Sequence, residues 1–163
     1  MNRHRSDLDS ETQIRDQPAH DRLRLWLRLL TCTSLVETEI RKRLREVYGV
    51  TLPRFDLMAQ LDREDAITLS DLSKRMMVSN GNVTGLVTRL VGSGHIARKT
   101  STSDRRVQRI SLTAKGRKEF RAMAAEHERW IEQLFDGLDT KDVAACLNDL
   151  AKVKESVRRG TGV

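Results

Sequence analysis

Apolar residues recur at helical spacing along most of the chain, and this pattern predicts six helices. The first and longest begins near Ala19, keeps its apolar period to Val47 and is ended by Gly49. Each later helix is expected to follow a short polar residue, because such a side chain accepts a hydrogen bond from the free N–H groups of a first turn. These N-cap candidates are Thr68, Ser79, Thr113 and either Asp139 or Thr140, while the second helix is expected to start at Thr51-Leu52-Pro53 with proline in its first turn.

Between the fourth and fifth helices the periodicity changes to alternation. Gly92-Ser93-Gly94 ends the fourth helix, and residues 96–100 and 107–112 then read as two strands joined by a polar tip. Two short helices followed by a hairpin make a winged helix-turn-helix. The predicted fold class is therefore mainly α with a small β-hairpin wing.

The fourth helix has an unusual outward face. Its apolar positions form one stripe, which leaves small hydrogen-bonding residues and two glycines on the other side. A glycine costs about 1 kcal/mol against alanine inside a helix, so this face suits a helix that approaches DNA closely better than a poorly optimised surface helix. The predicted DNA contacts are Ser79, Asn80, Gly81, Asn82, Thr84, Gly85 and Thr88, with Lys74 and Arg75 of the preceding helix reaching phosphates.

Positive charge is concentrated next to this helix. Residues 95–120 hold eight of the 30 lysines and arginines of the chain but only two of its 23 acidic residues. A basic hairpin beside a helix-turn-helix is placed to contact phosphates or the minor groove. Double-stranded DNA is therefore the predicted partner.

The wing motif resembles a known family. Asp104-Arg105-Arg106 is followed by Ile-Ser-Leu-Thr-Ala-Lys-Gly at residues 110–116, which is similar to the Asp-x-Arg and hydrophobic-x-Leu-Thr-x-x-Gly signature of the MarR (multiple antibiotic resistance regulator) family. The resemblance covers residues 20–157. It implies a dimeric repressor, held together by its N- and C-terminal helices, whose DNA affinity falls when a ligand or oxidant acts on it.

Pattern and resemblance together predict the organisation of the chain. Two recognition helices related by a dyad would bind a pseudo-palindromic operator with half-sites about one helical turn apart. The expected parts are a flexible tail at 1–18, a single MarR-like domain at 19–157 with a DNA-binding lobe at 48–113 and dimerisation helices at 19–47 and 114–157, and a flexible end at 158–163.

The resemblance also gives roles to individual wing residues. Arg106 matches the arginine of the motif and is expected in the minor groove, where a narrow A·T tract concentrates negative potential. Arg105 is expected to touch the DNA backbone or only water. Asp104 cannot favour phosphates itself, so we expect it to orient a wing arginine or Arg89 through a bidentate pair, with a simple turn residue as the alternative.

A ligand pocket is expected between the dimer helices and the DNA-reading lobe. Within the family, the segments concerned are similar to those of regulators of aromatic-acid breakdown, some of which sense aryl-CoA thioesters such as p-coumaroyl-CoA. A CoA ester requires several cations beside an apolar slot. The predicted ligand residues are Trp26, Arg28, Leu30, Thr33, Arg41, Arg45, Arg54, Phe55 and Met58.

Enzyme chemistry finds no support in the sequence. The four histidines are scattered, and there is neither a Cys-x-x-Cys pair nor a glycine-rich phosphate motif, so no metal, cofactor or catalytic site is predicted. A ligand-free architectural DNA-binding protein is the alternative from another functional class.

Two cysteines, with no apolar run long enough for a membrane and no signal peptide, predict a cytoplasmic protein that makes no membrane contact. Some MarR relatives sense peroxide through a cysteine of the first helix. A redox switch at Cys32 is therefore a second alternative, although a buried cysteine that serves only for packing is the commoner case.

Overall fold

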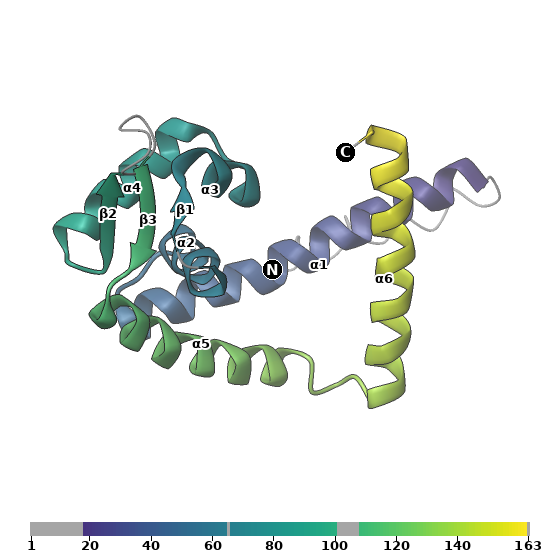
Figure 1. The fold of residues 1–163 in the computed structure, drawn as a ribbon. Coiled ribbons are helices and arrows are strands. Elements are labelled where there is room, and N and C mark those ends of the chain that lie inside the picture. Colours follow the sequence, from purple (N-terminus) through teal and green to yellow (C-terminus); the bar gives the residue numbers. More distant parts are fainter. Residues whose placement is uncertain (1–17, 65, 101–107, 163) are drawn as a thin grey trace, which may run out of the picture. The chain divides into compact units, whose positions relative to one another are not determined.

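The computed structural model describes residues 18–64, 66–100 and 108–162. These residues form six helices and three strands (Figure 1): α1 Pro18–Tyr48, α2 Leu52–Arg63, β1 Ile67–Thr68, α3 Leu69–Met76, α4 Asn80–Gly92, β2 Ile96–Thr100, β3 Gln108–Leu112, α5 Ala114–Leu134 and α6 Thr140–Thr161. The predicted fold class is confirmed. The chain divides into two compact units between Lys42 and Arg43, inside α1. The predicted DNA-binding lobe at 48–113 and its flanking dimerisation helices stay a prediction.

Short polar residues begin the helices, as predicted. The Thr68 hydroxyl accepts from the Asp71 N–H at 3.1 Å and donates to the Asp71 carboxylate at 2.7 Å. The Ser79 and Thr113 hydroxyls accept from the N–H groups of Asn82 and Gly116 and so cap α4 and α5, and Asp139 rather than Thr140 caps α6. Thr51 makes no side-chain cap bond, and proline in the first turn of α2 needs no partner for its missing N–H.

The strands form a three-stranded antiparallel sheet with the order β1-β3-β2. Its register aligns Ile67 with Ile110 and Ile96 with Leu112, and all four side chains are buried. The strand β1 was not predicted, because two residues are too few to show an alternating pattern. It extends the hairpin into a sheet that packs against the helices.

The core of the second unit lies among α2, α3, α4 and the sheet. Its fully buried side chains are Leu44, Leu57, Met58, Leu61, Leu72, Val83, Val87, Leu90 and Ile110. Phe55 links this core to α5, since its ring lies 5.4 Å from that of Phe120 and 4.9 Å from that of His127. Burial lowers the pKa of His127, so its imidazole is neutral at physiological pH.

Both long terminal helices expose apolar side chains. None of the side chains of α6 is buried, and the exposed fraction of Leu147 is 65%. Cys32 and Cys146 are also exposed, so Cys32 does not have the buried packing role that was expected to be the commoner case. The helix α6 continues to Thr161, past the predicted start of a flexible end at residue 158. No helix within the described residues has the length and apolar character needed to cross a bilayer.

Candidate nucleic-acid interface

The helices α3 and α4 form a helix-turn-helix. Met77 ends α3 in the left-handed region with φ of 53°, and its N–H donates to the carbonyl of Lys74. The Val78 N–H donates to the Ser73 carbonyl at 3.2 Å, and Ser79 then caps the next helix. These contacts reverse the chain within three residues. They place α4 beside α3 and the sheet (Figure 1).

The two faces of α4 differ in burial, as the sequence predicted: one is buried and the other is exposed. Val83, Val87 and Leu90 are buried in the lobe. All of the predicted contacts on the opposite face are exposed: Ser79, Asn80, Gly81, Asn82, Thr84, Gly85 and Thr88. The helix therefore presents a continuous face of small residues to the outside.

No contact within the described residues requires the two outward glycines. A Cβ built at Gly81 or Gly85 would meet no atom within 4 Å, and neither residue has a positive φ. The hydroxyls of Thr84 and Thr88 donate to backbone carbonyls one turn earlier, at 2.8 and 2.9 Å. The Thr84 oxygen can still accept a hydrogen bond from outside, whereas the Thr88 oxygen already accepts one from Arg98. The face thus combines close backbone access with hydrogen-bonding atoms.

Two cationic side chains on α3 flank this face. Lys74 is exposed and has no side-chain partner among the described residues, so it is free to reach a phosphate. Arg75 is also exposed but forms an ion pair with Glu64 after the end of α2. A phosphate contact by Arg75 would have to replace that pair.

Arg98 is a site residue that sequence reasoning missed. Its guanidinium lies next to the outward face of α4, which we call the reader face, where Nη2 donates to the Thr88 hydroxyl oxygen at 3.0 Å. The alternation of side chains along the strand could have located it, because Arg98 is two residues after the buried Ile96 and so lies on the same side of β2. Arg98 adds a positive charge at the C-terminal end of the reader face.

The wing tip lies outside the described residues. Asp104, Arg105 and Arg106 all fall between residues 101 and 107, so their predicted roles stay predictions. The proposed partner Arg89 is exposed on α4 and forms no ion pair with any residue that the structure describes.

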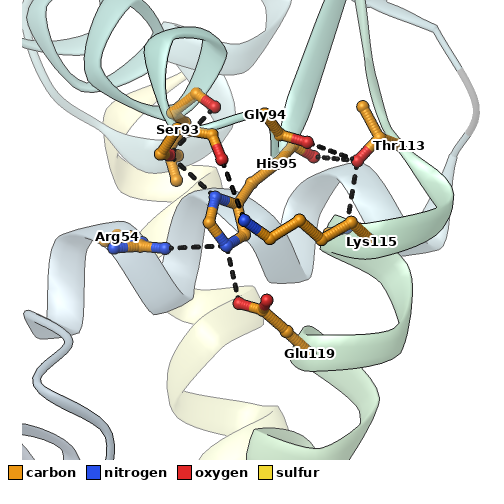
Figure 2. A network of polar contacts seen from close by, with 9 residues as sticks. Arg54, Ser93, Gly94, His95, Thr113, Lys115 and Glu119 are labelled. Atoms are coloured by element: carbon orange, nitrogen blue, oxygen red, sulfur yellow. Dashed lines mark hydrogen bonds and ion pairs between the residues drawn. The ribbon is translucent and has the colours of Figure 1, made fainter.

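The C-terminal end of α4 is fastened to α5 by the Leu-Thr-x-x-Gly motif (Figure 2). The Thr113 hydroxyl donates toward the carbonyls of Gly94 and His95, at 2.7 and 3.2 Å, and accepts from the Gly116 N–H at 3.0 Å. Gly116 allows this approach, since a Cβ there would lie 2.1 Å from the His95 carbonyl oxygen. The motif therefore holds the hairpin base and the first turn of α5 together.

A pocket of about 290 Å³ lies against the other side of α4. The residues that line it are Gly49, Thr51, Arg54, Leu86, Arg89, Leu90 and Ser93. The Nε atom of Arg54 is buried and has no hydrogen-bond partner. The pocket thus combines two leucines with two arginines that lack an acidic partner among the described residues.

The predicted ligand residues are divided between the two units. Trp26, Arg28, Leu30, Thr33 and Arg41 belong to the first unit, where all are exposed and Arg41 pairs with Glu37. In the second unit, Phe55 and Met58 are core residues and Arg45 is exposed. Arg54 is the member of the set that lines the pocket against α4.

No group of three or more His, Cys, Asp or Glu side chains within the described ranges is arranged to hold a metal ion. His95 and Glu119 are in contact, but the other nearby polar side chains are Arg54 and Ser93. This cluster suits hydrogen bonding and not metal coordination.

Known proteins share this arrangement. Residues 50–107 match the model of the MarR family. The crystal structure of a MarR family transcriptional regulator from Silicibacter pomeroyi is 30% identical, with a TM-score of 0.74 over 88% of this chain and 99% of that chain. FabT of Streptococcus pneumoniae, solved in complex with DNA, is 25% identical, with a TM-score of 0.71 over 84% and 97%. The transcriptional activatory protein BadR of Rhodopseudomonas palustris is 27% identical over 140 residues, which are 83% of this chain and 79% of BadR.

The helix-turn-helix, the outward face of α4 and the hairpin that follows define a winged-helix DNA-binding protein. The chain belongs to the MarR family of transcriptional regulators. The family predicted from the wing motif is therefore confirmed. Its members regulate transcription and are not enzymes, which agrees with the prediction that this chain is not an enzyme.

Proposed function

We propose that the chain is a homodimeric, ligand-responsive repressor that reads a pseudo-palindromic operator with α4. The observation that carries the DNA-reading role is the exposed face of α4, where two glycines have no neighbour that would exclude a side chain. Glycine at such positions weakens the helix, so its benefit must come from outside the protein. A major groove that receives the helix closely provides that benefit.

The homodimer is supported by apolar side chains that the chain itself does not cover. Trp26 of α1 is 57% exposed, and Val143, Leu147, Leu150 and Val157 are exposed along α6. Exposed apolar side chains that recur on one face of a helix mark an interaction site. A second copy of the chain would bring two recognition helices to one operator, in agreement with the predicted dyad.

The ligand that we propose is an aromatic acid or its CoA thioester. The pocket against α4 supports an anionic group, because Arg54 and Arg89 lack acidic partners among the residues described. Its volume is at the small end of ligand pockets, so it would hold an aromatic acyl group but not a whole CoA. The rest of a thioester would have to lie outside, near cations such as Arg45.

The direction of control that we propose is release of DNA by the ligand. An anion held between α2 and α4 acts on the reader helix itself, and it must bind the DNA-free state better by the free energy of the release it causes. BadR bears the name of an activatory protein, so a reporter assay with and without ligand is the appropriate test of direction. The exposed thiol of Cys32 keeps a redox response as the second candidate.

The DNA-reading role is tested by selecting a sequence from random double-stranded DNA with the full-length chain. Arg106→Ala should weaken binding to the selected DNA at least tenfold and reduce the slope of log affinity against log salt by about 1. Arg121→Ala removes the same charge from an exposed position of α5 and should leave affinity within about twofold. Equal loss in both variants would contradict a specific role for the wing arginine.

The ligand is tested by calorimetric titration with p-coumarate, p-coumaroyl-CoA and free CoA. We expect the thioester to bind more tightly than the acid, since it adds phosphate charges that exposed arginines can meet. Equal affinity for the acid and the thioester would contradict the CoA proposal. DNA release by peroxide that is absent from a Cys32→Ser variant would instead support the redox candidate.

A further inference from the structure

The imidazole of His95 contacts the end of α4 and the helix α5, and it lies beside Arg54 of α2 (Figure 2). It lies after the C-terminal end of α4, and its side chain is only 7% exposed. Its Nδ1 lies 2.7 Å from the Ser93 hydroxyl, and its Nε2 lies 2.6 Å from Oε2 of Glu119 on α5. Arg54 of α2 places Nη2 3.3 Å from the same Nε2.

Which of these contacts are hydrogen bonds depends on which ring nitrogen of His95 carries a hydrogen. A carboxylate only accepts, so the close contact with Glu119 requires that Nε2 carries the hydrogen. Nε2 then cannot accept from Arg54, whose guanidinium contributes charge beside the ring but no second bond to it. At the other nitrogen, the Ser93 hydroxyl can either donate to Nδ1 or accept from it and donate to the Leu90 carbonyl, 3.2 Å away.

Two of the contacts of His95 are with the C-terminal end of α4, namely Leu90 and Ser93. The Leu90 carbonyl accepts from the His95 N–H at 2.9 Å, and the Ser93 carbonyl accepts from Lys115 of α5 at 3.1 Å. The final carbonyls of a helix have no partner within the helix and fray unless something binds them. Here the backbone N–H groups of Ser93, Gly94 and His95 bind these carbonyls, and α5 adds contacts through Lys115 and, by way of Glu119, through the His95 side chain.

Glu119 is the accessible end of this network. Its side chain is 46% exposed, so the contact with His95 lies at the boundary between buried imidazole and solvent. A hydrogen bond to a charged group at such a boundary can be broken without opening the core. A change along α5 can therefore loosen the end of α4 while the lobe stays folded.

We propose that His95 and Glu119 are positioning residues for the recognition helix, and that Glu119 fixes the C-terminal end of α4 to α5 through His95. This inference rests on the proposed role of α4 in reading DNA. It gives a function to a histidine that sequence analysis treated as one of four scattered residues. It also makes α5 a regulator of how firmly the reader helix is held.

The coupling is tested first without DNA, by hydrogen–deuterium exchange of the full-length chain. Glu119→Ala removes the acceptor, whereas Glu119→Gln loses the same charge but keeps an oxygen that accepts from Nε2. We expect exchange at residues 93–95 to become about tenfold faster in Glu119→Ala and to stay near the parent rate in Glu119→Gln. Glu128→Ala, which removes a carboxylate from an exposed position of α5, is the matched control and should match the parent. Equal exchange in the Ala and Gln variants would overturn the proposal.

The second readout is the ratio of affinities for the DNA sequence selected by the parent and for a scrambled duplex of equal length. A positioning role predicts that Glu119→Ala lowers this ratio about fivefold while nonspecific affinity stays the same, and that Glu119→Gln restores it. A ratio that stays constant despite faster exchange would overturn the link to DNA reading. If the parent selects no sequence at all, the proposed function fails, and the exchange measurement still decides whether Glu119 holds α4.

Discussion

At the scale of single residues, Gly116 determines how closely α5 approaches the end of the reader helix. Its missing side chain leaves room for the His95 carbonyl oxygen, which a Cβ would approach to 2.1 Å. That oxygen also accepts hydrogen bonds from the Thr113 N–H at 3.0 Å and from the Thr113 hydroxyl. The glycine of the family motif is thus needed for packing between backbone segments and not for an unusual φ.

Gly116→Ala should therefore destabilise the chain. The new methyl group would force the first turn of α5 away from the hairpin base, which we expect to cost about 2–3 kcal/mol in the free energy of unfolding. Urea denaturation followed by circular dichroism measures this cost. Gly137→Ala is the control, because a Cβ at Gly137 meets nothing within 4 Å and should change stability by no more than about 0.5 kcal/mol. Similar free energies for both variants would contradict the packing role of Gly116.

The sequence identified Gly116 and Thr113 through the motif but could not show what they contact. Their partner, His95, lies at the other end of the hairpin, and only the pairing of β2 with β3 brings the two ends together. Met77 illustrates a different limit. It adopts the left-handed conformation that usually indicates glycine or asparagine, so its residue type gave no signal of the turn.

At the scale of elements, the outward glycines of α4 lower the stability of this helix and leave its backbone uncovered by side chains. Its buried stripe was predictable because apolar residues at helical spacing have one consistent explanation. The caps of α3, α4 and α5 were predictable for the same reason, since short polar residues precede each stripe. The strand β1 was not, because its two residues become a strand only by pairing with β3.

Replacing the outward glycines of α4 should separate stability from function. Gly81→Ala and Gly85→Ala should each raise the free energy of unfolding by about 0.5–1 kcal/mol, because alanine favours the helix and the added methyl meets no protein atom. The same variants should bind the selected DNA at least tenfold more weakly, since the methyl group would meet the groove. Denaturation and mobility-shift assays on the same samples measure the two effects.

Gly92→Ala supplies the control for this pair. Gly92 is the last residue of α4, and a Cβ there also meets nothing within 4 Å. Because it lies at the opposite end of the helix from the N-terminal reader residues, DNA affinity should stay within about twofold. Unchanged DNA affinity in Gly81→Ala and Gly85→Ala would mean that α4 does not approach DNA through this face.

At the scale of the whole molecule, α6 is the element whose surface is least explained by a single chain. Its apolar residues keep helical spacing, yet none of its side chains is buried. An amphipathic helix whose apolar stripe faces water loses the main source of helix stability. The sequence revealed the stripe, but one chain cannot show what covers it. A second copy is the partner that the proposed symmetric DNA site would require.

A charge placed on this stripe should therefore separate the two subunits. Leu147→Asp puts a carboxylate at a position whose apolar side chain is 65% exposed in the single chain, and burying that charge against a partner would oppose association. We expect sedimentation to change from twice the chain mass to the chain mass, and affinity for the selected palindrome to fall at least a hundredfold, because each monomer then binds only one half-site. Asn148→Asp adds the same charge to the next residue of α6, outside the apolar stripe, and should stay dimeric. If Leu147→Asp remains a dimer while the circular dichroism of the helices is unchanged, the two copies associate through a different surface.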